Sequence, residues 1–401
     1  MASIILFDNH IREHLLPLTY TRPMSELRVG ILSIREKWEK WLDAPAYHIT
    51  QDYLAGKYGL DYSDVNYVIN GSVLPSPQLC ALIRQMDNNE AYLQGDELIV
   101  AKVGVKQLEK LIKDEEIEEL IGIDVQNTDF PKINRLWDIF RQNDQAIRDD
   151  FELLTKGRES APLSESNRKI GDAYPIFIEE GAQVEGASLN CTEGPIYIGK
   201  NAVVMEGSLL RGSLAICENA IVKMGARIYG GTTIGPHCKV GGELVNSVLQ
   251  SYSNKSHEGF LGNSVIGEWC NIGADTTTSN LKNNYEPIKV WSYPEQRFEQ
   301  SNSQFCGLIM GDHAKTGIST MLNTGTVIGV AANVFGSGFP RTFIPSFSWG
   351  GASGYTTFKP EKAFQMIENM MERREVQFSP EERLIILRIF EETSKYRRWE
   401  K

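Results

Sequence analysis

The stretch SYSNKSHEGF, residues 251–260, places a single histidine, His257, among small and polar neighbours. Imidazole has an ordinary pKa of about 6.5, so at neutral pH it can accept a proton from an attacking amine or hydroxyl group. An exposed loop histidine without a chemical role would have the same surroundings, and the stretch alone leaves both interpretations open. His237 lies in a regular repeat and has no comparable setting.

The chain that leads to His257 repeats every six residues. Aliphatic residues occupy eight consecutive positions of this repeat: Ile198, Val204, Leu210, Ile216, Val222, Ile228, Ile234 and Val240. A period of six fits neither a helix nor a simple strand, and it is typical of a β-helix built from hexapeptide repeats. Three hexapeptides close one triangular coil of about eighteen residues, so the pattern predicts a left-handed parallel β-helix.

The repeat loses its phase around His257. The spacing between Val240 and Ile266, where the aliphatic pattern resumes, is not a multiple of six. The pattern continues at Ile272 and resumes from Met310 after the polar stretch 281–305. We therefore expect residues 251–260 to form a loop extruded from a coil that otherwise continues, since a rigid coil is a good support for a reactive side chain.

Four segments follow from the change in composition along the chain. Residues 1–155 alternate short apolar runs with helix-like stretches, which predicts an α/β domain, and residues 156–172 have linker composition. Residues 173–345 form the predicted β-helix. Residues 346–401 are predicted to contain two helices that cap its open end, where unpaired strand edges would otherwise be exposed.

Composition excludes several classes of function. The net charge of −11 argues against a nucleic-acid partner, because phosphate backbones bind to basic surfaces. No apolar run reaches the length of a membrane span, and the six cysteines lack the CxxC spacing of zinc sites. We therefore expect a cytoplasmic protein with no membrane segment, no disulfide framework and no metal-ligating residues that can be named.

The segment SNKSHEGFLGNSVIGEWCNIGADTTTSNLKNNY resembles the acetyltransferase half of the bifunctional N-acetylglucosamine-1-phosphate uridylyltransferase and glucosamine-1-phosphate N-acetyltransferase family. That family carries S-K-x-x-H-L-x-Y-L-G-D followed by N-x-G-A-G-T-x-T-x-N-Y. The resemblance places the catalytic histidine on His257 and the sugar-contacting asparagines on Asn271 and Asn280. It also places a substrate arginine, which would pair with the phosphate of the sugar, on Arg227 and a glutamate on Glu243.

The resemblance implies an acetyl-CoA-dependent N-acyltransferase. In such an enzyme His257 would deprotonate the amino group of a sugar, and the coenzyme would lie between neighbouring β-helices of a homotrimer. Three positions depart from the family: Val245 replaces a basic residue, Phe260 replaces a sugar-contacting tyrosine, and Leu281 replaces a second tyrosine. These departures weaken the case for glucosamine-1-phosphate and leave a related amino-sugar phosphate or nucleotide-linked amino sugar as the acceptor.

The amino-terminal half resembles a shortened sugar nucleotidyltransferase. Its first strand, SIILFD, is followed by LLPLTYTRPMSELRVG, which keeps Thr21 and Arg22 but lacks the glycine pair that cradles phosphates in that family. Thr21, Arg22, Arg28 and Asn70, the last in VINGSVLP, are candidate residues for binding a nucleoside triphosphate, with Mg²⁺ as its metal in the family mechanism. Each arginine could equally brace a loop or an interface.

Three functions remain open at this point. The leading one is N-acyl transfer at His257. The second is synthesis of a nucleotide-sugar by the amino-terminal domain, with the β-helix as a trimerisation scaffold. The third is a sugar-nucleotide-binding protein in which both sites have lost their activity.

Overall fold

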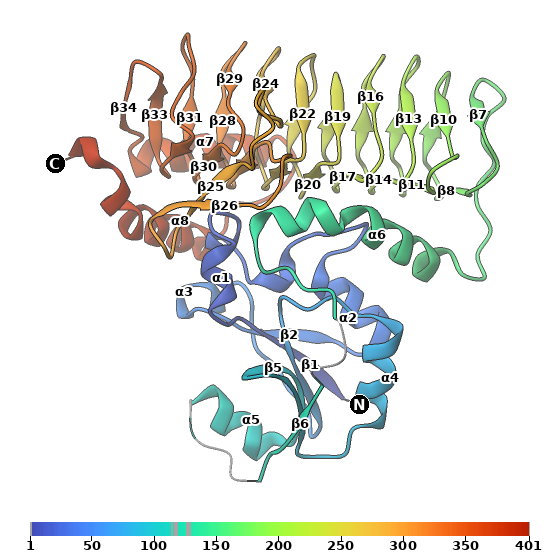
Figure 1. Cartoon of the computed structure of the whole chain (residues 1–401), viewed down its shortest axis with the longest axis vertical. Helices are drawn as coiled ribbons and strands as arrows, with labels where there is room; N and C mark the ends of the chain where they lie inside the picture. Colours follow the sequence, from blue (N-terminus) through green and yellow to red (C-terminus); the bar gives the residue numbers. More distant parts are fainter. Residues whose placement is uncertain (1, 114, 116–118, 126–129, 401) are drawn as a thin grey trace. The chain divides into compact units, whose positions relative to one another are not determined.

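The computed structural model describes residues 2–113, 115, 119–125 and 130–400, and the chain divides into two compact units (Figure 1). The first unit comprises residues 1–15, 21–27 and 32–135, and the second comprises residues 16–20, 28–31 and 136–401. This division differs from the predicted boundary at residue 155. The reason is that helix α6 (Leu136–Thr155) packs against strands of the β-helix.

The first unit is built on a mixed six-stranded sheet with the order β2-β1-β3-β5-β4-β6. Three of its strands are parallel neighbours, β2, β1 and β3, and β5 then runs antiparallel to β3 and β4. The strands are β1 (Ser3–Phe7), β2 (Ala46–Ile49), β3 (Asn66–Asn70), β4 (Glu90–Gln94), β5 (Glu97–Val103) and β6 (Ile121–Asp124).

Among the described residues of this unit, five α-helices and a 3₁₀ turn accompany the sheet: α1 (Ile11–His14), η2 (Met24–Glu26), α2 (Ile34–Leu42), α3 (Asp52–Ala55), α4 (Pro77–Gln85) and α5 (Val105–Ile112). Local sequence determines where two of them begin. Ser33 and Glu36 form a reciprocal capping box at the start of α2. Ser76 caps α4 immediately before Pro77, which is favoured in the first helical turn because its missing N–H is not needed there.

The second unit is dominated by a three-sided parallel β-helix, and the predicted fold class is confirmed. We name each face after its first strand. The β7 face contains β7 (Arg168–Ile170), β10 (Ser188–Asn190), β13 (Leu209–Arg211), β16 (Arg227–Ile228), β19 (Glu243–Val245) and β22 (Phe260–Gly262), continued by the pair β24 (Thr277–Thr278) and β29 (Met321–Leu322).

The other two faces run parallel to it along the helix. The β8 face contains β8 (Ile176–Ile178), β11 (Ile196–Ile198), β14 (Leu214–Ile216), β17 (Thr232–Ile234), β20 (Val248–Leu249), β23 (Val265–Ile266), β27 (Ile309–Met310), β30 (Val327–Ile328) and β32 (Phe343–Ile344). The β9 face contains β9 (Gln183–Val184), β12 (Val203–Val204), β15 (Ile221–Val222), β18 (Lys239–Val240), β21 (Asn254–Lys255), β28 (Lys315–Thr316), β31 (Asn333–Val334), β33 (Ser348–Gly351) and β34 (Gly354–Thr357).

Aliphatic side chains stacked from coil to coil form the core of the β-helix. Strand pairing sets Ile198 beside Ile216 and Ile216 beside Ile234, and all three side chains are fully buried. All eight aliphatic positions of the predicted repeat belong to this one core. Burial of this many aliphatic groups is the main stabilising contribution, at about 25 cal/mol per Å² of apolar surface.

Helix α6 is tied to the β8 face through buried polar contacts within the second unit. Asn143 donates to the carbonyl of Gly231 at 2.8 Å and accepts from the backbone N–H of Gly30 at 2.7 Å. Asp150 accepts from the N–H of Ile31 at 2.8 Å. Because these backbone groups are buried, each would otherwise lack a partner in the core.

The predicted extruded loop at residues 251–260 is wrong. That stretch contains β21 and the first residue of β22, both paired with the preceding coil. The interval from Val222 to its strand partner Val240 is one full coil, whereas the interval from Val240 to its partner Lys255 is shorter, so the phase break is a shortened coil. The shortening lies in the two corners that follow Val240, because Leu244, the strand partner of Ile228, and Leu249, the strand partner of Ile234, both come earlier than the period of six would place them.

The true excursion from the coil lies further along the chain. Between β24 and β27 the chain leaves the coil and forms an antiparallel hairpin of β25 (Lys289–Ser292) and β26 (Arg297–Gln300). Its position matches the polar stretch 281–305 that interrupts the repeat in the sequence. The coil resumes in phase, because β27 pairs directly with β23.

The carboxy-terminal region contains α7 (Pro360–Glu372), α8 (Pro380–Glu392), η3 (Ser394–Tyr396) and η4 (Arg398–Glu400), so the two predicted helices are present. The last coil ends in the antiparallel hairpin β33–β34, and η4 packs against β34. Arg374, just beyond α7, donates to Asn254 of β21 at 3.4 Å. The helical region therefore reaches back along the β9 face as well as meeting the end of the coil.

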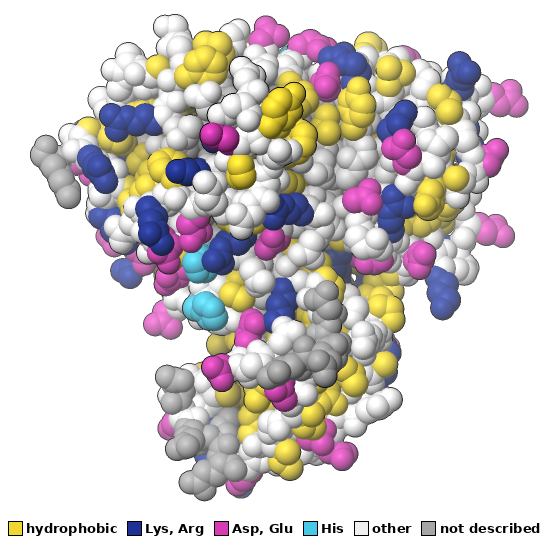
Figure 2. Space-filling view, in the orientation of Figure 1, with side chains coloured by type: hydrophobic (Ala, Val, Ile, Leu, Met, Phe, Trp, Pro, Cys, Tyr) yellow, Lys and Arg dark blue, Asp and Glu magenta, His cyan; other side chains and the backbone are white. Residues whose placement is uncertain are grey.

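No helix among the described residues combines the length and the apolar character that crossing a bilayer would require. Figure 2 shows basic and acidic side chains interspersed over the face in view.

Candidate functional site

His257 lies on the turn between β21 and β22, with its side chain exposed. The turn is anchored from inside the coil by Lys255. Its ammonium donates to the carbonyl of His257, to that of Glu258 at 3.1 Å and to that of Gly241 at 3.3 Å. The imidazole is therefore displayed on a backbone that is held in place by a buried cation.

Lys255 occupies a position that the repeat normally gives to an aliphatic residue. Its strand partner is Val240, which in turn pairs with Val222, and the lysine side chain is only 1% exposed. Burial lowers the pKa of Lys255 to about 8, because the charged form loses its hydration; nearby Glu258 acts in the opposite direction.

A cluster of three charged side chains accompanies the turn. Arg227 donates to Glu258 at 2.8 Å and lies 3.8 Å from the carboxylate of Glu243. The hydrogen bond with Glu258 raises the pKa of Arg227, and the same bond lowers the pKa of Glu258. Strand register on the β7 face sets Arg227 beside Glu243 and Glu243 beside Phe260. The strand register thus sets three of the residues expected to bind the acceptor sugar, Arg227, Glu243 and Phe260, on neighbouring strands.

The two expected sugar-binding asparagines lie on other parts of the coil. Asn271 is on the β9 face, bridged to Asn254 and Lys315, and is half-buried. Asn280 follows β24, at the far end of the β7 face, and donates to Asn263 at 2.8 Å. Asn280 also lies near Phe260, since its Nδ2 and the Phe260 ring are both 2.6 Å from the point where a Cβ on Gly262 would lie.

Sequence reasoning missed two residues of this site. Lys255 has no signal in the period of six, which counted from Val240 expects an aliphatic residue at position 258; only the shortened coil brings Lys255 to the inward column. Glu258 itself has none, since a carboxylate beside a loop histidine is unremarkable in sequence. Its role depends on Arg227, which lies 31 residues earlier and is brought to it by the coil.

The first unit offers a second candidate site, at the carboxyl ends of its parallel strands, where ligands bind in open α/β sheets. Asp8 directly follows β1 and accepts hydrogen bonds from the N–H of Met24 at 2.8 Å and from Thr50 at 2.6 Å. Arg12 lies 3.5 Å from the same carboxylate. Burial raises the pKa of Asp8 despite these contacts.

Three of the four predicted nucleotide-binding residues belong to the first unit: Asn70 is the strand partner of Phe7, which precedes Asp8, and Thr21 and Arg22 come shortly before Met24, whose N–H Asp8 accepts. Asn70 is fully buried and uses its amide on Glu97, Leu98 and Ser72. Arg22 is buried and donates to Thr21 at 3.4 Å. Arg28 belongs to the second unit, where its backbone pairs with the side chain of Gln250.

A magnesium site does not fit the side chains that the structure describes. In the described ranges no group of three or more His, Cys, Asp or Glu side chains could hold a metal ion. Asp8 already accepts two hydrogen bonds and faces Arg12, whereas Mg²⁺ requires several free oxygen ligands in octahedral geometry. We therefore derive no reaction step through a metal.

Comparison with known proteins gives one family-model match and several curated relatives. Residues 4–159 match the family model described as sugar nucleotidyl transferase. The bifunctional protein GlmU of Methanocaldococcus jannaschii is 36% identical over 87 residues, which is 22% of this chain and 21% of that protein. The bifunctional sugar-1-phosphate nucleotidylyltransferase/acetyltransferase of Sulfurisphaera tokodaii is 31% identical over 93 residues, which is 23% of each protein.

The resemblance found in the sequence motifs is thereby confirmed: this chain combines a segment that matches the sugar nucleotidyl transferase family with a β-helix, and it is similar to GlmU proteins. It spans less than a quarter of the length of these two relatives. A solved polysialic acid O-acetyltransferase, OatWY, matches 48% of this chain and 88% of its own, with 16% identity and a TM-score of 0.19, which is too low to support a conclusion.

The buried ammonium of Lys255 predicts a specific pH dependence of stability. Its pKa is about 8 when folded and about 10.5 when unfolded, so between these values the unfolded chain binds more protons and stability rises with pH. The unfolding free energy of the wild type, relative to Lys255→Met, should increase by about 2 to 3 kcal/mol from pH 7 to pH 10. Urea denaturation at both pH values measures it.

The comparison with Lys255→Met isolates this one group. Lys315, whose pKa burial also lowers to about 8, is present in both proteins and cancels in the difference. A difference in unfolding free energy that stays constant with pH would contradict the burial of the ammonium.

Proposed function

We propose that this chain is a sugar-metabolising transferase whose β-helix performs acetyl-CoA-dependent N-acyl transfer. The acceptor would be an amino-sugar phosphate or a nucleotide-linked amino sugar. The observation that carries this proposal is the exposed imidazole of His257 on a turn anchored by Lys255, beside the charged cluster of Arg227. The similarity to the Sulfurisphaera protein, which is named as a bifunctional nucleotidylyltransferase and acetyltransferase, supports the proposal.

In this proposal His257 acts as general base. Its unprotonated nitrogen takes a proton from the acceptor amine while the amine nitrogen forms a bond to the thioester carbonyl carbon. The carbon–sulfur bond then breaks, and the proton passes to the departing thiolate. Imidazole suits both proton transfers because its ordinary pKa lies near neutrality.

The net charge of the neighbouring cluster indicates whether the cluster contacts the phosphate or the amino group of the acceptor. Arg227, Glu243 and Glu258 together carry one net negative charge, and the arginine is already paired. A phosphate would have to displace carboxylates from Arg227, whereas an ammonium group would be attracted. We therefore assign the cluster to the amine side of the acceptor, and this differs from the phosphate role that the family resemblance implies for Arg227.

A homotrimer is part of the proposal. Exposed apolar side chains gather on the β7 face and at its corner with the β9 face: Leu209, Met224, Tyr229, Ile318 and Met321. Large apolar side chains exposed along one face are the kind of surface that association with another copy covers. A neighbouring copy could also supply Asn271, which lies on the β9 face. The six free, buried cysteines support a reducing, cytoplasmic location.

A second candidate function is nucleotidyl transfer by residues 4–159. The family-model match favours it. The arrangement around Asp8 does not offer a magnesium site, so this function stands behind the first.

Replacing His257 with alanine should abolish acetyl transfer. Loss of a general base typically lowers the rate by a factor of about 10² to 10⁴. The measurement is free thiol released from acetyl-CoA with a panel of amino sugars, their 1-phosphates and their nucleotide diphosphates. His237→Asn is the matched control, since asparagine tolerates the positive φ at that position, and it should retain turnover. Unchanged turnover in His257→Ala would contradict the role of His257 as general base.

Light scattering should give three times the chain mass of 45.1 kDa, as expected for a trimer. Ile318→Asp should dissociate it, because the side chain is 75% exposed in one chain and a carboxylate there would be desolvated in the interface. Leu384→Asp on α8, a comparably exposed position, should leave the mass unchanged. A trimer that survives Ile318→Asp would exclude this surface as the interface.

If the second candidate function operates, pyrophosphate should be released from a nucleoside triphosphate and a sugar-1-phosphate. This release should depend on Mg²⁺ and fall at least about tenfold in Arg22→Gln, since an arginine–phosphate contact is charge-assisted. Arg84→Gln, on the exposed side of α4, is the control. Absence of release in the wild type would remove nucleotidyl transfer from consideration.

A further inference from the structure

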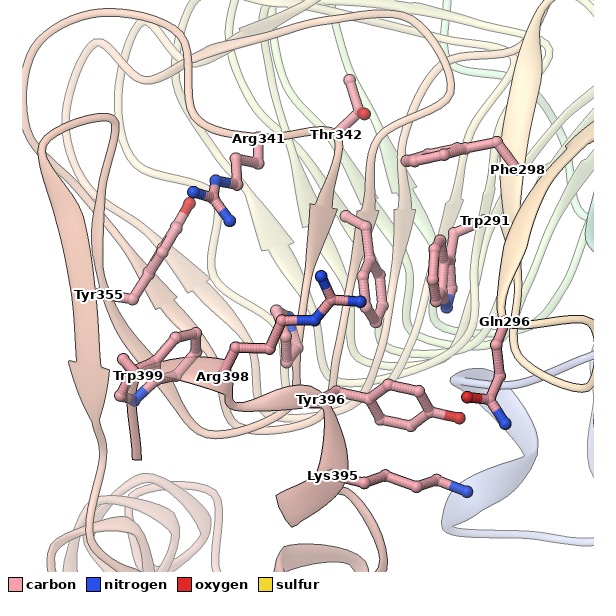
Figure 3. A pocket seen from close by; sticks show the side chains of 12 residues that line it. Trp291, Gln296, Phe298, Arg341, Thr342, Tyr355, Lys395, Tyr396, Arg398 and Trp399 are labelled. Carbon is pink, nitrogen blue, oxygen red and sulfur yellow. The ribbon is translucent and has the colours of Figure 1, made fainter. Parts of the chain in front are cut away.

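A cavity of about 440 Å³ lies in the second unit, far along the chain from His257 (Figure 3). Four segments enclose it: the β25–β26 hairpin, residues 341–345, Tyr355 of β34, and the carboxy-terminal turns η3 and η4. The volume lies within the range of small-molecule sites, about 300 to 1,000 Å³.

Flat aromatic rings form much of its wall. Trp291 stacks on Phe343 with the ring centres 4.1 Å apart and an angle of 10° between the planes. Tyr396 meets both rings edge-on, and the ring centres of Tyr355 and Trp399 are 5.7 Å apart. Rigid ring faces of this kind provide platforms on which a planar ligand can stack.

The charge of the lining is positive in an otherwise acidic protein. Arg341, Lys395 and Arg398 line the cavity, and its twelve lining residues include no aspartate or glutamate. No ion pair joins Arg341 or Arg398 to a carboxylate within residues 2–400 as described. In Figure 3 Arg398 projects into the cavity and the guanidinium of Arg341 lies beside the Tyr355 hydroxyl. Two guanidinium groups thus face a space without a counter-ion from the described chain.

Two buried donor groups in the wall also lack a protein partner. The indole nitrogen of Trp291 and the hydroxyl of Tyr355 are buried and make no hydrogen bond within the described parts of the chain. Burial raises the pKa of Tyr355 to about 12, so this hydroxyl keeps its proton at neutral pH and can donate it in a hydrogen bond. Both atoms are covered by neighbouring protein atoms, so the recognition of a ligand rests on the guanidinium groups and the aromatic wall.

We propose that this cavity binds a nucleoside phosphate, with the base stacked on the aromatic wall and the phosphate held by Arg341 and Arg398. Guanidinium groups bind phosphate oxygens in a bidentate manner, and aromatic rings stack on any base. Free nucleotides and the nucleoside 3′,5′-bisphosphate part of coenzyme A share this chemistry. The site does not depend on catalysis at His257.

Isothermal titration of the full-length protein tests the proposal. The probes are uridine 5′-diphosphate, adenosine 3′,5′-bisphosphate, the two unphosphorylated nucleosides and inorganic pyrophosphate. At least one nucleoside phosphate should bind, and both nucleosides and pyrophosphate should bind at least about tenfold more weakly, since each lacks one of the two recognised groups. Preference between the two nucleoside phosphates identifies the source of the ligand.

Variants locate the binding. Arg341→Gln combined with Arg398→Gln should weaken binding at least about tenfold. Arg297→Gln should not, because Arg297 lies on the β25–β26 hairpin but is not among the residues that line the cavity. Arg22→Gln and His257→Ala should keep the affinity, which separates this cavity from the first unit and from the proposed acyl-transfer site. Binding that is unaffected by the double variant, pyrophosphate that binds as well as the nucleotides, or no binding by any probe would each overturn the proposal.

Discussion

Stacking of each coil on the preceding one is the constraint on which the β-helix depends. Parallel pairing sets a residue beside its equivalent in the next coil, so its inward or outward orientation is inherited along the helix. The column Ile198, Ile216 and Ile234 shows the result, since all three side chains are fully buried. A change in coil length must be absorbed at a corner, and here the two corners that follow Val240 are shorter than their counterparts in the preceding coil.

The shortened coil explains why a lysine lies inside the protein. Because this circuit is shorter than the one before it, Lys255 falls on the inward column beside Val240. An ammonium in an apolar core is costly, and here it is compensated by the carbonyls of Gly241, His257 and Glu258. The turn that displays the imidazole is therefore connected to the core itself. Its position is a consequence of coil geometry more than of loop composition.

Outward columns follow the same rule, so charges far apart in the sequence become neighbours. Arg227 meets Glu243 because their strands pair, and Glu258 reaches the same guanidinium from the next corner. In the first unit, by contrast, the polar side chains are positioned by the ends of the strands. Asp8 lies at the carboxyl end of β1, and Asn70 at the end of β3 accepts hydrogen bonds from Ser72 in the turn that follows.

The amino-acid sequence by itself determined the β-helix, because a buried aliphatic is required at one position in each hexapeptide and the requirement repeats at a fixed period. It also predicted the two terminal helices that the structure contains, and through the family resemblance it proposed His257, Arg227 and Glu243 as site residues. It placed the excursion wrongly, since a phase break looks the same whether residues are inserted into a coil or removed from it. Only strand register distinguishes these two cases.

The tertiary structure alone decided which residues meet. Whether Asn271, Asn280 or Arg28 belongs to a site depends on the face, corner or unit in which each residue lies. The amino-acid composition does not determine these positions. The pairing of Arg227 with Glu258 and the cavity between the β25–β26 hairpin and the carboxy-terminal turns arise in the same way. Local patterns encode the period of a fold, whereas contacts between distant segments exist only once the coils are stacked.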